Sequence, residues 1–380
     1  MKLYIKRTFT IISLIVLPLM FVSITQNRVD HNTLRIQGFY QEEKNSLDIV
    51  FVGSSEVFTG YSPAYAYGKC GFTSYNISVE SNRLEFFESQ IKEVLSRQDP
   101  KLIVVEISDA VNEWNADSDR AEFLATLRKY TDRMPISLNK IDTINEFVDE
   151  QKLSYYFPFI MYHGQLSNLG GARTCISQDL RGTTYLKGAI STNHKTDYVH
   201  LIDIKNDYDN VPLSISSQER LYKLLDYCRT LDCKVLFTHF PRRIENETDY
   251  TEYLQRNTVE KIICDNGFDF VNLERLSDDI QIDSLNDYYD NGHLNALGQM
   301  KLTEYLGKLI NKKYKIVPQR LSALNKENWE KSYTYINLFY DYYKLHEDGP
   351  EEWWYEKPAL IDSLDQMMSQ KDITSTKPTD

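Results

Sequence analysis

Two places in the chain hold side chains whose type and spacing suit nucleophilic catalysis, and the first is a serine that follows a predicted strand. Five of the six residues from Leu47 to Val52 are apolar, and most are β-branched or aromatic, which predicts a strand buried on both faces. Ser55 follows in the turn Gly53-Ser54-Ser55. Ligands bind at the carboxyl ends of the strands in an open parallel sheet, so we expect this hydroxyl to face a cleft. Ser55 is therefore a candidate nucleophile, although a Gly-Ser-Ser turn also fits a plain turn or a phosphate-binding loop.

The second place is an Asp–His pair near the other end of the chain. Asp290 and His293 are three residues apart in a turn-prone stretch that contains Asn291-Gly292. The Asp290 carboxylate can fold back to accept the Nδ1 proton of His293, which leaves Nε2 free to act as a base. Together with Ser55, in the chain order Ser, Asp, His, the pair predicts the catalytic triad of a serine hydrolase.

Three further polar residues are candidates for the wall of the same pocket. Glu56 is next to the candidate nucleophile, where it either tunes the site or stabilises the start of a helix. Asp109 follows the predicted strand 101–108, and His239 follows the predicted strand 233–238. His239 is also an alternative base, but no acidic partner lies close to it in the sequence. The other histidines lack the spacing of metal ligands, so we predict no metal and no other cofactor: they are His31, His163, His194, His200 and His346.

Composition and charge limit the class of protein. With 380 residues, of which 42% are hydrophobic, the chain is long enough for a large globular core. Its formal net charge of −12 argues against a nucleic-acid partner, because phosphates attract a basic surface. The five cysteines are scattered and give no disulfide framework or zinc spacing. We expect buried thiols, with a Cys228–Cys233 bridge as the alternative.

The N-terminal residues have the pattern of a membrane anchor. A basic start, residues 1–7, precedes the uncharged and largely apolar run Thr8–Ile24, whose 17 residues are just long enough to cross a bilayer as a helix. The positive-inside rule places the N-terminus in the cytoplasm and the remainder outside. A cleaved signal peptide is the alternative, but Val22–Gln26 offers a poor cleavage site. We therefore predict a single-pass, membrane-anchored protein with residues 1–25 as the basic start and anchor and residues 26–45 as a polar spacer.

Helices and strands are predicted to alternate between residues 46 and 312, which is the pattern of one α/β domain. We expect a doubly wound, flavodoxin-like and mostly parallel sheet with helices on both faces. An insertion at about residues 117–207 is expected to cover the upper rim of the sheet, and residues 61–75 to form a loop with at most one short helix. The predicted strands are 47–52, 74–79, 101–108, 233–238 and 268–273. The predicted helices are 83–97, 120–130, 138–156, a helix to Cys228 capped by Ser216 or Ser217, 251–264, and 296–312 capped by Asn295.

The C-terminal residues are expected to add to this domain. Residues 313–370 are predicted to form a helical, aromatic appendage, with a helix at 321–343. We expect Trp353-Trp354-Tyr355 to help fold this appendage onto the main domain, with sugar stacking or a membrane contact as alternatives. Residues 371–380 are expected to be a disordered tail.

The two catalytic blocks resemble those of a known family. Gly53-Ser54-Ser55-Glu56 and Asp290-Asn291-Gly292-His293-Leu294-Asn295 are similar to the end blocks of SGNH/GDSL-type serine hydrolases. The resemblance is to the membrane-anchored branch that includes proteins of D-alanyl teichoic acid synthesis and of bacterial polysaccharide O-acetylation, and it covers about residues 46–312. It implies that Ser55 is the nucleophile, His293 the general base and acid, and Asp290 its orienting partner.

The same resemblance implies a function and a location. It indicates an extracytoplasmic serine esterase or O-acyltransferase that acts on acyl esters of a cell-surface glycan or of an acylated carrier, with a membrane acyltransferase as a partner. The alternative is a catalytically inactive module of this type that binds glycan or the acyltransferase. A nucleotide-binding domain fits poorly, because only one glycine lies between Leu47 and Thr59.

The middle blocks depart from the family pattern around the expected oxyanion hole. Ser78 stands where the family usually has a glycine, and Glu106-Ile107-Ser108-Asp109 where it usually has an asparagine. Backbone N–H groups of Ser55 and Ser78 remain as donors, and Asn82 or Asn112 is a substitute side-chain donor. Loss of one such donor typically costs about 3 kcal/mol of transition-state stabilisation, so these departures favour the inactive alternative.

Overall fold

A computed structural model of the chain describes residues 14, 28, 30–112, 119–164, 184–197, 199–204, 208–345, 353–354 and 366. The predicted membrane span, apart from Leu14, and the predicted tail lie outside the described residues. Among the residues that are described, no helix is both long enough and apolar enough to cross a bilayer.

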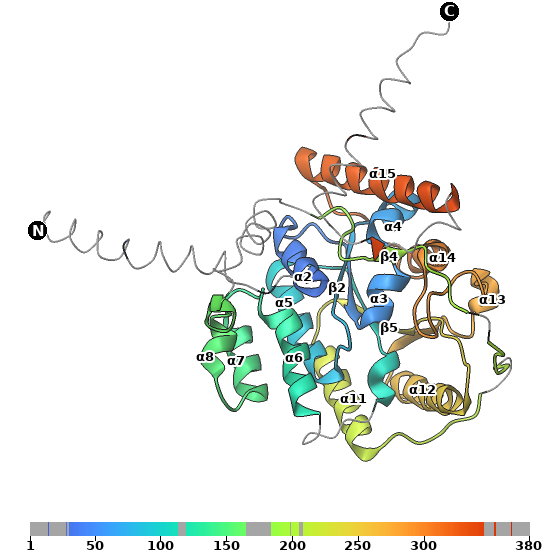
Figure 1. Cartoon of the computed structure of the whole chain (residues 1–380), viewed down its shortest axis with the longest axis horizontal. Coiled ribbons are helices and arrows are strands. Elements are labelled where there is room, and N and C mark those ends of the chain that lie inside the picture. The colour runs from blue at the N-terminus through green and yellow to red at the C-terminus, as the bar shows by residue number, and fades with distance from the viewer. Residues whose placement is uncertain are drawn as a thin grey trace, which may run out of the picture.

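A five-stranded sheet forms the centre of the molecule (Figure 1). Its strands are β1 Ile49–Gly53, β2 Ser74–Ser78, β3 Leu102–Glu106, β5 Lys234–His239 and β6 Asp269–Asn272. They lie in the order β2-β1-β3-β5-β6, and every neighbouring pair is parallel. The predicted α/β class and parallel sheet are thus confirmed, and each predicted strand begins and ends within two residues of its observed bounds. The chain turns to opposite sides of β1 to form β2 and β3, so the loops after β1 and β3 diverge and leave room for a ligand.

Helices cover both faces of this sheet, as expected for a doubly wound fold. The helices that pack on it are α2 His31–Gln41, α3 Ser55–Gly60, α4 Pro63–Cys70, α5 Leu84–Arg97, α11 Ile215–Cys228, α12 Glu247–Asp265 and α14 Ala296–Tyr314. Side chains of β1 alternate between two core clusters: Val50 and Val52 join α2, α5, α11 and α12, whereas Ile49 and Phe51 join α3, α4 and α14. The hydrophobic cores on the two faces therefore fix the direction in which each strand end points.

Polar caps determine where three of these helices begin. The predicted cap of α14 is confirmed, because the Asn295 side chain accepts hydrogen bonds from the N–H groups of Leu297 and Gly298. Helix α11 is capped by Ser214, not by Ser216 or Ser217 as predicted. Helix α12 begins at Glu247, four residues before its predicted start, since Asn246 supplies its cap. All three helices were predicted from the sequence, and the errors in the predicted starts of α11 and α12 lie in the first turn of each helix.

The predicted polar spacer is wrong, because part of it forms helix α2. Asp30 caps this helix by accepting a hydrogen bond from the N–H of Thr33. Ile36 and Phe39 are buried in the core, and the helix packs against β2. Buried polar residues such as Arg35 hid the pattern, since they lie on the same inward face as the two apolar residues.

The turn after β1 contains a helix that the sequence did not predict. Helix α3 begins directly at Ser55, and α4 is the single short helix expected within residues 61–75. Ser62 caps α4, Pro63 is its first residue, and Gly71 ends it with a φ of 83°. The nucleophile candidate is therefore the first residue of a helix, close to the carboxyl end of β1.

The insertion forms an outer layer of helices beside the sheet. Its helices are α6 Arg120–Thr131, α7 Leu138–Phe147, α8 Lys152–Tyr156 and α9 Phe159–Tyr162. Helix α6 packs against α2 and α7 packs against α5, so these two helices do not cover the upper rim of the sheet. A later residue of the insertion does reach the rim as expected, since Ile190 lines the same cavity as Ser55. The predicted helix 138–156 is interrupted after Phe147, and Gln151 has a left-handed φ of 53° before α8 begins.

The C-terminal appendage folds onto the main domain, as predicted. Helix α15, Ala323–Leu345, packs against α4 and α14, and its own Trp329 is buried in this contact with the domain. Strand β7, Trp353–Trp354, pairs antiparallel with β4, Ser191–Thr192. Lys187 lies 4.4 Å from the Trp329 ring and donates a 2.8 Å hydrogen bond to the buried carboxylate of Glu42. This contact ties the segment before β4 to the appendage.

The described cysteines are free thiols. Cys228 is buried and Cys233 half-buried, and no disulfide joins them, so the alternative of a bridge between them is wrong. Cys175 lies outside the described residues.

Candidate active site

The structure brings Ser55, His293 and Asp290 together. Nε2 of His293 is 2.6 Å from Oγ of Ser55, although the two residues are 238 positions apart in the chain. Nδ1 of His293 is 2.9 Å from each carboxylate oxygen of Asp290. With Nδ1 donating to Asp290, Nε2 accepts the hydroxyl proton of Ser55, which is the arrangement of a nucleophile and its general base.

Close packing at the end of β1 positions the serine. A side chain at Gly53 would bring its Cβ within 2.5 Å of Val57 and 2.9 Å of the Cβ of Glu106, so only glycine fits there. The chain then turns into α3, in which Ser55 is the first residue and Phe58 lies one turn further on. The hydroxyl is thus held at the switch point between β1 and β3, as expected from the sequence.

A tight loop before α14 positions the other two residues. The Asp290 carboxylate accepts hydrogen bonds from the backbone N–H groups of Gly292 and His293, each at 2.9 Å. The N–H of Tyr289 donates to the carbonyl of His293, and the tip of the loop is fixed by a 2.7 Å bond from the N–H of Arg243 to the carbonyl of Asn291. We call the segment Tyr288–Leu294 the catalytic loop; its two ends form a β-bridge.

Contacts around the imidazole set its protonation. Burial alone would lower the pKa of His293, but its hydrogen bond to the Asp290 carboxylate and the charge of Glu56 raise the pKa above its ordinary value. Burial would raise the pKa of Asp290, and its hydrogen bonds to His293 hold it below the ordinary value. The Tyr289 ring stacks on the imidazole with centroids 5.2 Å apart. The carboxylate therefore stays ionised and stabilises the imidazolium that forms when Ser55 loses its proton.

A cavity of about 370 Å³ opens beside Ser55 and His293. The remaining residues that line it are His31, Phe58, Glu80, Ser81, Ile190 and Tyr289, and the sequence analysis assigned none of them to the site. Phe58 and Tyr289 carried a usable signal, because they lie within one helical turn of Ser55 and next to Asp290. His31 comes from a segment distant in the chain, and nothing in the sequence pointed to it, whereas Ile190 lies in the insertion that was expected to cover the rim.

Polar residues at the rim of this cavity are bound to one another. Nε2 of His31 is 3.1 Å from the Glu80 carboxylate, which also accepts a hydrogen bond from Asn32. The hydrogen bond from His31 and these other contacts hold the pKa of Glu80 well below its ordinary value, in spite of partial burial. Glu80 is therefore a fixed negative charge beside the cavity at neutral pH.

The expected oxyanion donors are only partly where the sequence placed them. Asn82 is buried, and its amide nitrogen donates to the carbonyl of Gly53 at 2.8 Å and to Gln90 at 2.9 Å. Both amide protons are thus used within the fold, and the prediction that Asn82 donates to an oxyanion is wrong. Ser78 is also fully buried, opposite Gly53 in the sheet, and does not line the cavity. In the loop after β2, Glu80 and Ser81 reach the cavity instead.

Glu56 and Asp109 lie beneath the site and do not line the cavity. Glu56 is buried, receives a 2.9 Å hydrogen bond from Arg242 and is bonded by the Ser54 hydroxyl. Although burial raises its pKa, the charges of Arg242 and His293 and the Ser54 hydrogen bond bring the pKa of Glu56 below its ordinary value. It is therefore an ionised group close to His293, which supports the prediction that it tunes the site.

Two further acids surround this carboxylate. Burial and the charge of Glu56 raise the pKa of Asp109 to about 6. Burial, Glu56 and Asp109 raise the pKa of Glu106 to about 8, so Glu106 holds a proton at neutral pH. Its Oε1 is bonded by Ser108, and its Oε2 is buried with no hydrogen-bond partner among the described residues.

His239 is a buried structural residue, so its prediction as a pocket residue or base is wrong. The side chain is fully buried, and its Nε2 is 3.1 Å from the carbonyl of Arg256. Burial and the charge of Arg256 hold its pKa well below the ordinary value. A neutral imidazole that donates to a backbone carbonyl cannot serve Ser55.

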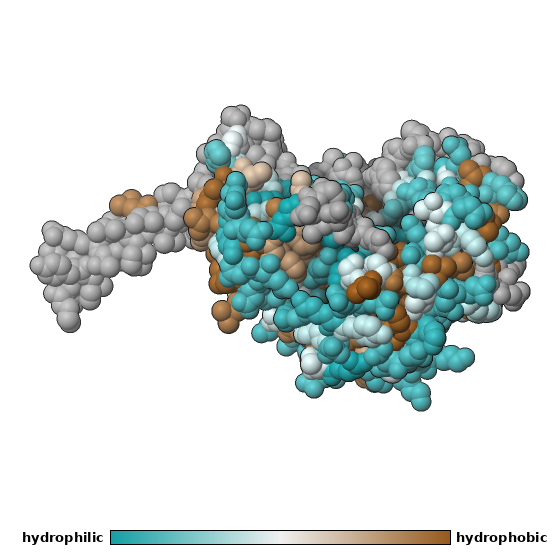
Figure 2. Space-filling model, turned by 90° about the horizontal axis from the view of Figure 1, so that it is seen from below, coloured by the Kyte–Doolittle hydropathy of each residue, from teal (hydrophilic) through white to brown (hydrophobic). Residues whose placement is uncertain are grey.

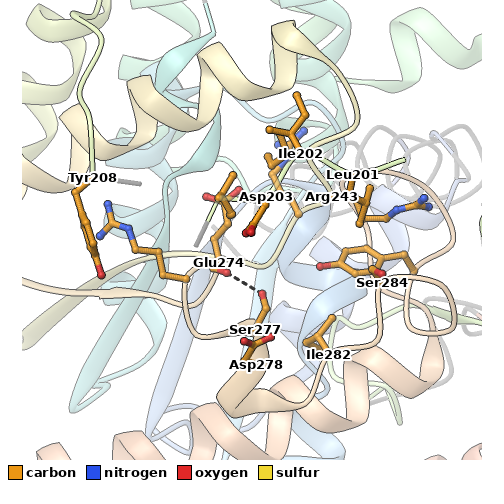
Figure 3. Close-up of a pocket in the computed structure, with 15 residues that line it drawn as sticks. Leu201, Ile202, Asp203, Tyr208, Arg243, Glu274, Ser277, Asp278, Ile282 and Ser284 are labelled. Atoms are coloured by element: carbon orange, nitrogen blue, oxygen red, sulfur yellow. Dashed lines mark hydrogen bonds between the residues drawn. The ribbon is translucent and has the colours of Figure 1, made fainter. Parts of the chain in front are cut away.

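A second and larger cavity, of about 640 Å³, lies on the other side of the catalytic loop (Figure 3). Arg242, whose guanidinium bonds Glu56, lines this cavity, and so does Tyr288 of the catalytic loop. Figure 3 shows Asp203 and Glu274 near its centre and Tyr208 at one side. Glu274 accepts a 2.7 Å hydrogen bond from Arg256, and Arg275 donates a 2.8 Å hydrogen bond to Glu260. The charges of Glu274 and Arg275 are therefore balanced by partners behind the cavity wall.

The described residues contain no group of three His, Cys, Asp or Glu side chains arranged to hold a metal ion. No protein-family model matches this chain, and no curated protein matches it significantly. The site must therefore be interpreted from its own geometry.

Proposed function

We propose that this chain is a serine-dependent ester hydrolase or O-acyltransferase of the SGNH/GDSL type. The observation that carries the proposal is the short contact between Ser55 Oγ and His293 Nε2, 2.6 Å, with Asp290 bonded to the opposite ring nitrogen. The parallel sheet with strand order β2-β1-β3-β5-β6 and a serine at its switch point supports the same assignment.

The chemistry follows the usual two steps of acyl transfer. His293 takes the hydroxyl proton as Ser55 Oγ attacks the ester carbonyl, and Asp290 stabilises the imidazolium that results. The tetrahedral intermediate collapses to an acyl-serine when His293 returns the proton to the leaving alkoxide. Water or a sugar hydroxyl is then deprotonated by His293 and attacks the acyl-serine, which releases the acid or the acylated acceptor and restores Ser55.

The oxyanion must be held by backbone groups in this proposal. The Asn82 amide is bonded elsewhere, so the N–H of Ser55 is the first donor. The turn that contains Ser81 lines the cavity and is the nearest source of a second donor. Ser55 begins helix α3, and Ser81 lies in the turn that follows the edge strand β2.

The substrate class follows from the resemblance and the size of the site. A cavity of about 370 Å³ is near the small end of the range for ligand sites, about 300–1,000 Å³, and suits a short acyl ester. With the predicted anchor at residues 8–24, the proposed protein is single-pass and extracytoplasmic. It acts on acyl esters of a cell-surface glycan or acylated carrier, and a membrane acyltransferase is its proposed partner.

Labelling with a fluorophosphonate probe tests the chemistry directly. The full chain should be labelled at Ser55 and should hydrolyse p-nitrophenyl acetate, and both signals should disappear in Ser55→Ala. Ser284→Ala is the matched control, because Ser284 lines the second cavity. Absence of label in the wild type, or label retained in Ser55→Ala, would exclude the proposal.

A catalytically inactive binding module is the second candidate. It is favoured by one observation: among the described residues that line the cavity, none carries a side-chain amide that could replace the expected asparagine. In this case glycan or acyltransferase binding should survive in Ser55→Ala and His293→Ala, and the wild type should show no ester turnover.

A further inference from the structure

Helices α8 and α9 present an apolar face to the outside of the molecule. Leu153 is 64% exposed, Phe157 39%, Ile160 41% and Met161 55%. Leu153 lies on α8, Phe157 follows the end of α8, and Ile160 and Met161 lie on α9, so the four exposed side chains follow one another along a run of two short helices with a break at Phe157. We call these four residues the α8–α9 face. In Figure 2 hydrophobic residues gather at the left edge of the molecule, the edge at which α8 and α7 lie in Figure 1.

The opposite side of this run packs against the domain, so the exposed apolar side chains belong to a segment that is held in place. Ser154 and Tyr155 are buried, and the Arg128 guanidinium lies 3.6 Å from the Tyr155 ring and donates to Ser154. The Tyr162 hydroxyl donates a 2.7 Å hydrogen bond to Asp132, the residue that ends α6. The polar and aromatic contacts thus hold the run in place with its apolar side chains outward.

The chain enters the described domain beside this face. The carbonyl of Arg28 accepts a 3.3 Å hydrogen bond from Arg133, and Arg133 directly follows Asp132, whose carboxylate accepts the hydrogen bond from Tyr162. Tyr162 directly follows Met161 of the α8–α9 face. Arg28 and the apolar face are therefore neighbours on the surface.

The predicted membrane span ends only four residues before Arg28. Four residues from Ile24 reach at most about 14 Å when fully extended. This tether therefore keeps the surface around Arg28 within about 14 Å of the end of the predicted span. The surface around Arg28, which includes the α8–α9 face, must lie at or near the lipid headgroups.

We propose that the α8–α9 face inserts into the interface of the bilayer in which the chain is anchored. The contact is apolar, because a chain of net charge −12 gains nothing from an anionic surface. This inference rests on the membrane span of the proposed function but not on its catalytic chemistry. It adds a second membrane contact, which fixes how the domain is oriented on the membrane.

The orientation has a consequence for the substrate. His31, which lines the catalytic cavity, is seven residues from Ile24, a reach of at most about 25 Å. The cavity is therefore held close to the membrane surface, where esters on membrane-bound carriers or on glycan near the bilayer are presented.

Photocrosslinking of the full chain in phosphatidylcholine vesicles tests the contact. p-Benzoylphenylalanine is placed at Leu153 or Met161, and at Ile215 and Val317 as controls, which are 76% and 73% exposed. Mass spectrometry should find lipid adducts at Leu153 and Met161 at least ten-fold more often than at the controls. Equal yields at all four positions, or crosslinks at Leu153 and Met161 only to a second copy of the chain, would overturn the proposal.

A p-benzoylphenylalanine probe at Leu14, within the predicted span, distinguishes failure of the interfacial contact from failure of the membrane span. Lipid adducts at Leu14 without adducts at Leu153 or Met161 leave the anchor standing and refute only the interfacial contact. No lipid adducts at any of these positions refute the membrane span and, with it, this inference. Neither result affects fluorophosphonate labelling of Ser55, which tests the chemistry separately.

Discussion

The catalytic loop separates two cavities, and the smaller one is the candidate active site. Tyr289 of this loop faces the cavity of about 370 Å³ that contains Ser55 and His293. Its neighbour Tyr288 faces the cavity of about 640 Å³, together with Arg243. A choice by volume alone would select the larger cavity. Volume measures only the space available to a ligand and not the chemistry of the lining residues.

The two sides differ in what their polar groups are free to do. In the larger cavity, the carboxylate of Glu274 is held by Arg256, and both are buried. In the smaller cavity, the hydroxyl proton of Ser55 can move to Nε2 of His293, because the bonding partner of that nitrogen is a neutral hydroxyl and not a charged group. A proton relay that opens to a cavity identifies a catalytic site better than a cluster of neutralised charges does.

Arg242 links the two sides. It lines the larger cavity, yet its guanidinium bonds Glu56 beneath the nucleophile. A Cβ at Gly292 of the catalytic loop would lie 3.3 Å from the same guanidinium. The ion pair therefore holds the start of α3 and the catalytic loop together, and the larger cavity serves as the space behind this contact.

The largest expected effect separates the two cavities by a serine on each side. Ser55→Ala should lower kcat for p-nitrophenyl acetate by about 10⁴-fold to 10⁶-fold, because the nucleophile is removed. Ser284→Ala, in the larger cavity, should change kcat by less than two-fold. Steady-state assays of both purified variants measure kcat. Equal losses of kcat in both variants would contradict the assignment of the smaller cavity as the active site.

A smaller loss is expected when the orientation of the imidazole is disturbed. Asp290→Asn should lower kcat by about 10³-fold to 10⁴-fold, because the amide does not hold the Nδ1–H tautomer or stabilise the imidazolium. The melting temperature should change little, since the side chain is partly exposed. An activity within ten-fold of the wild type would mean that another group orients His293.

The sequence predicted the triad from two local signals that are weak alone and gain weight together, and from the family resemblance. Ser55 follows a run of buried-strand residues, and Asp290 and His293 lie in a turn close to a helix cap. The rule that parallel strands present their carboxyl ends at one edge then brings these distant segments together without further information. The strand positions were correct because the runs of apolar residues that predict them are local features of the sequence.

The residues that sequence reasoning missed or misplaced depend on contacts between distant segments. Asn82 follows a strand as a donor should, but its amide is used by Gly53 and Gln90. His239 ends a strand, yet it points into the core, and the alternation of β5 alone does not tell which polar side chain reaches a cavity. His31 was hidden in a segment whose buried polar residues resembled a spacer. Tertiary packing decides each of these cases.

The free energy of unfolding should depend on pH through Glu106, and Glu274 of the larger cavity should not cause such a dependence. Burial raises the pKa of Glu106 to about 8 from an ordinary value of 4.5, so the folded protein holds a proton that the unfolded chain releases between these values. The stability of the wild type should therefore decrease as pH rises from about 4.5 to 8. Glu106→Gln removes this dependence and should be more stable at pH 8.5 by on the order of a few kcal/mol.

Urea unfolding at pH 5 and at pH 8.5 measures this effect, and Glu274→Gln provides the contrast. Glu274 is ion-paired with the buried Arg256, so its loss should destabilise the protein at both pH values. If the free energies of unfolding of Glu106→Gln and Glu274→Gln changed with pH in the same way, the expected difference between the two cavities would be contradicted.

The smallest expected effect is a shift in the pH profile of the smaller cavity. His293 acts as a base only when neutral, so kcat/KM should fall as pH decreases through its pKa. The charge of Glu56 helps to raise that pKa, and Glu56→Gln should therefore move the acid limb of the profile to lower pH. Glu106→Gln is the matched control, because Glu106 is already protonated there and its replacement should leave the acid limb in place. Profiles of p-nitrophenyl acetate hydrolysis from pH 5 to 9 compare the variants, and an acid limb that moves to higher pH in Glu56→Gln would contradict a tuning role for this carboxylate.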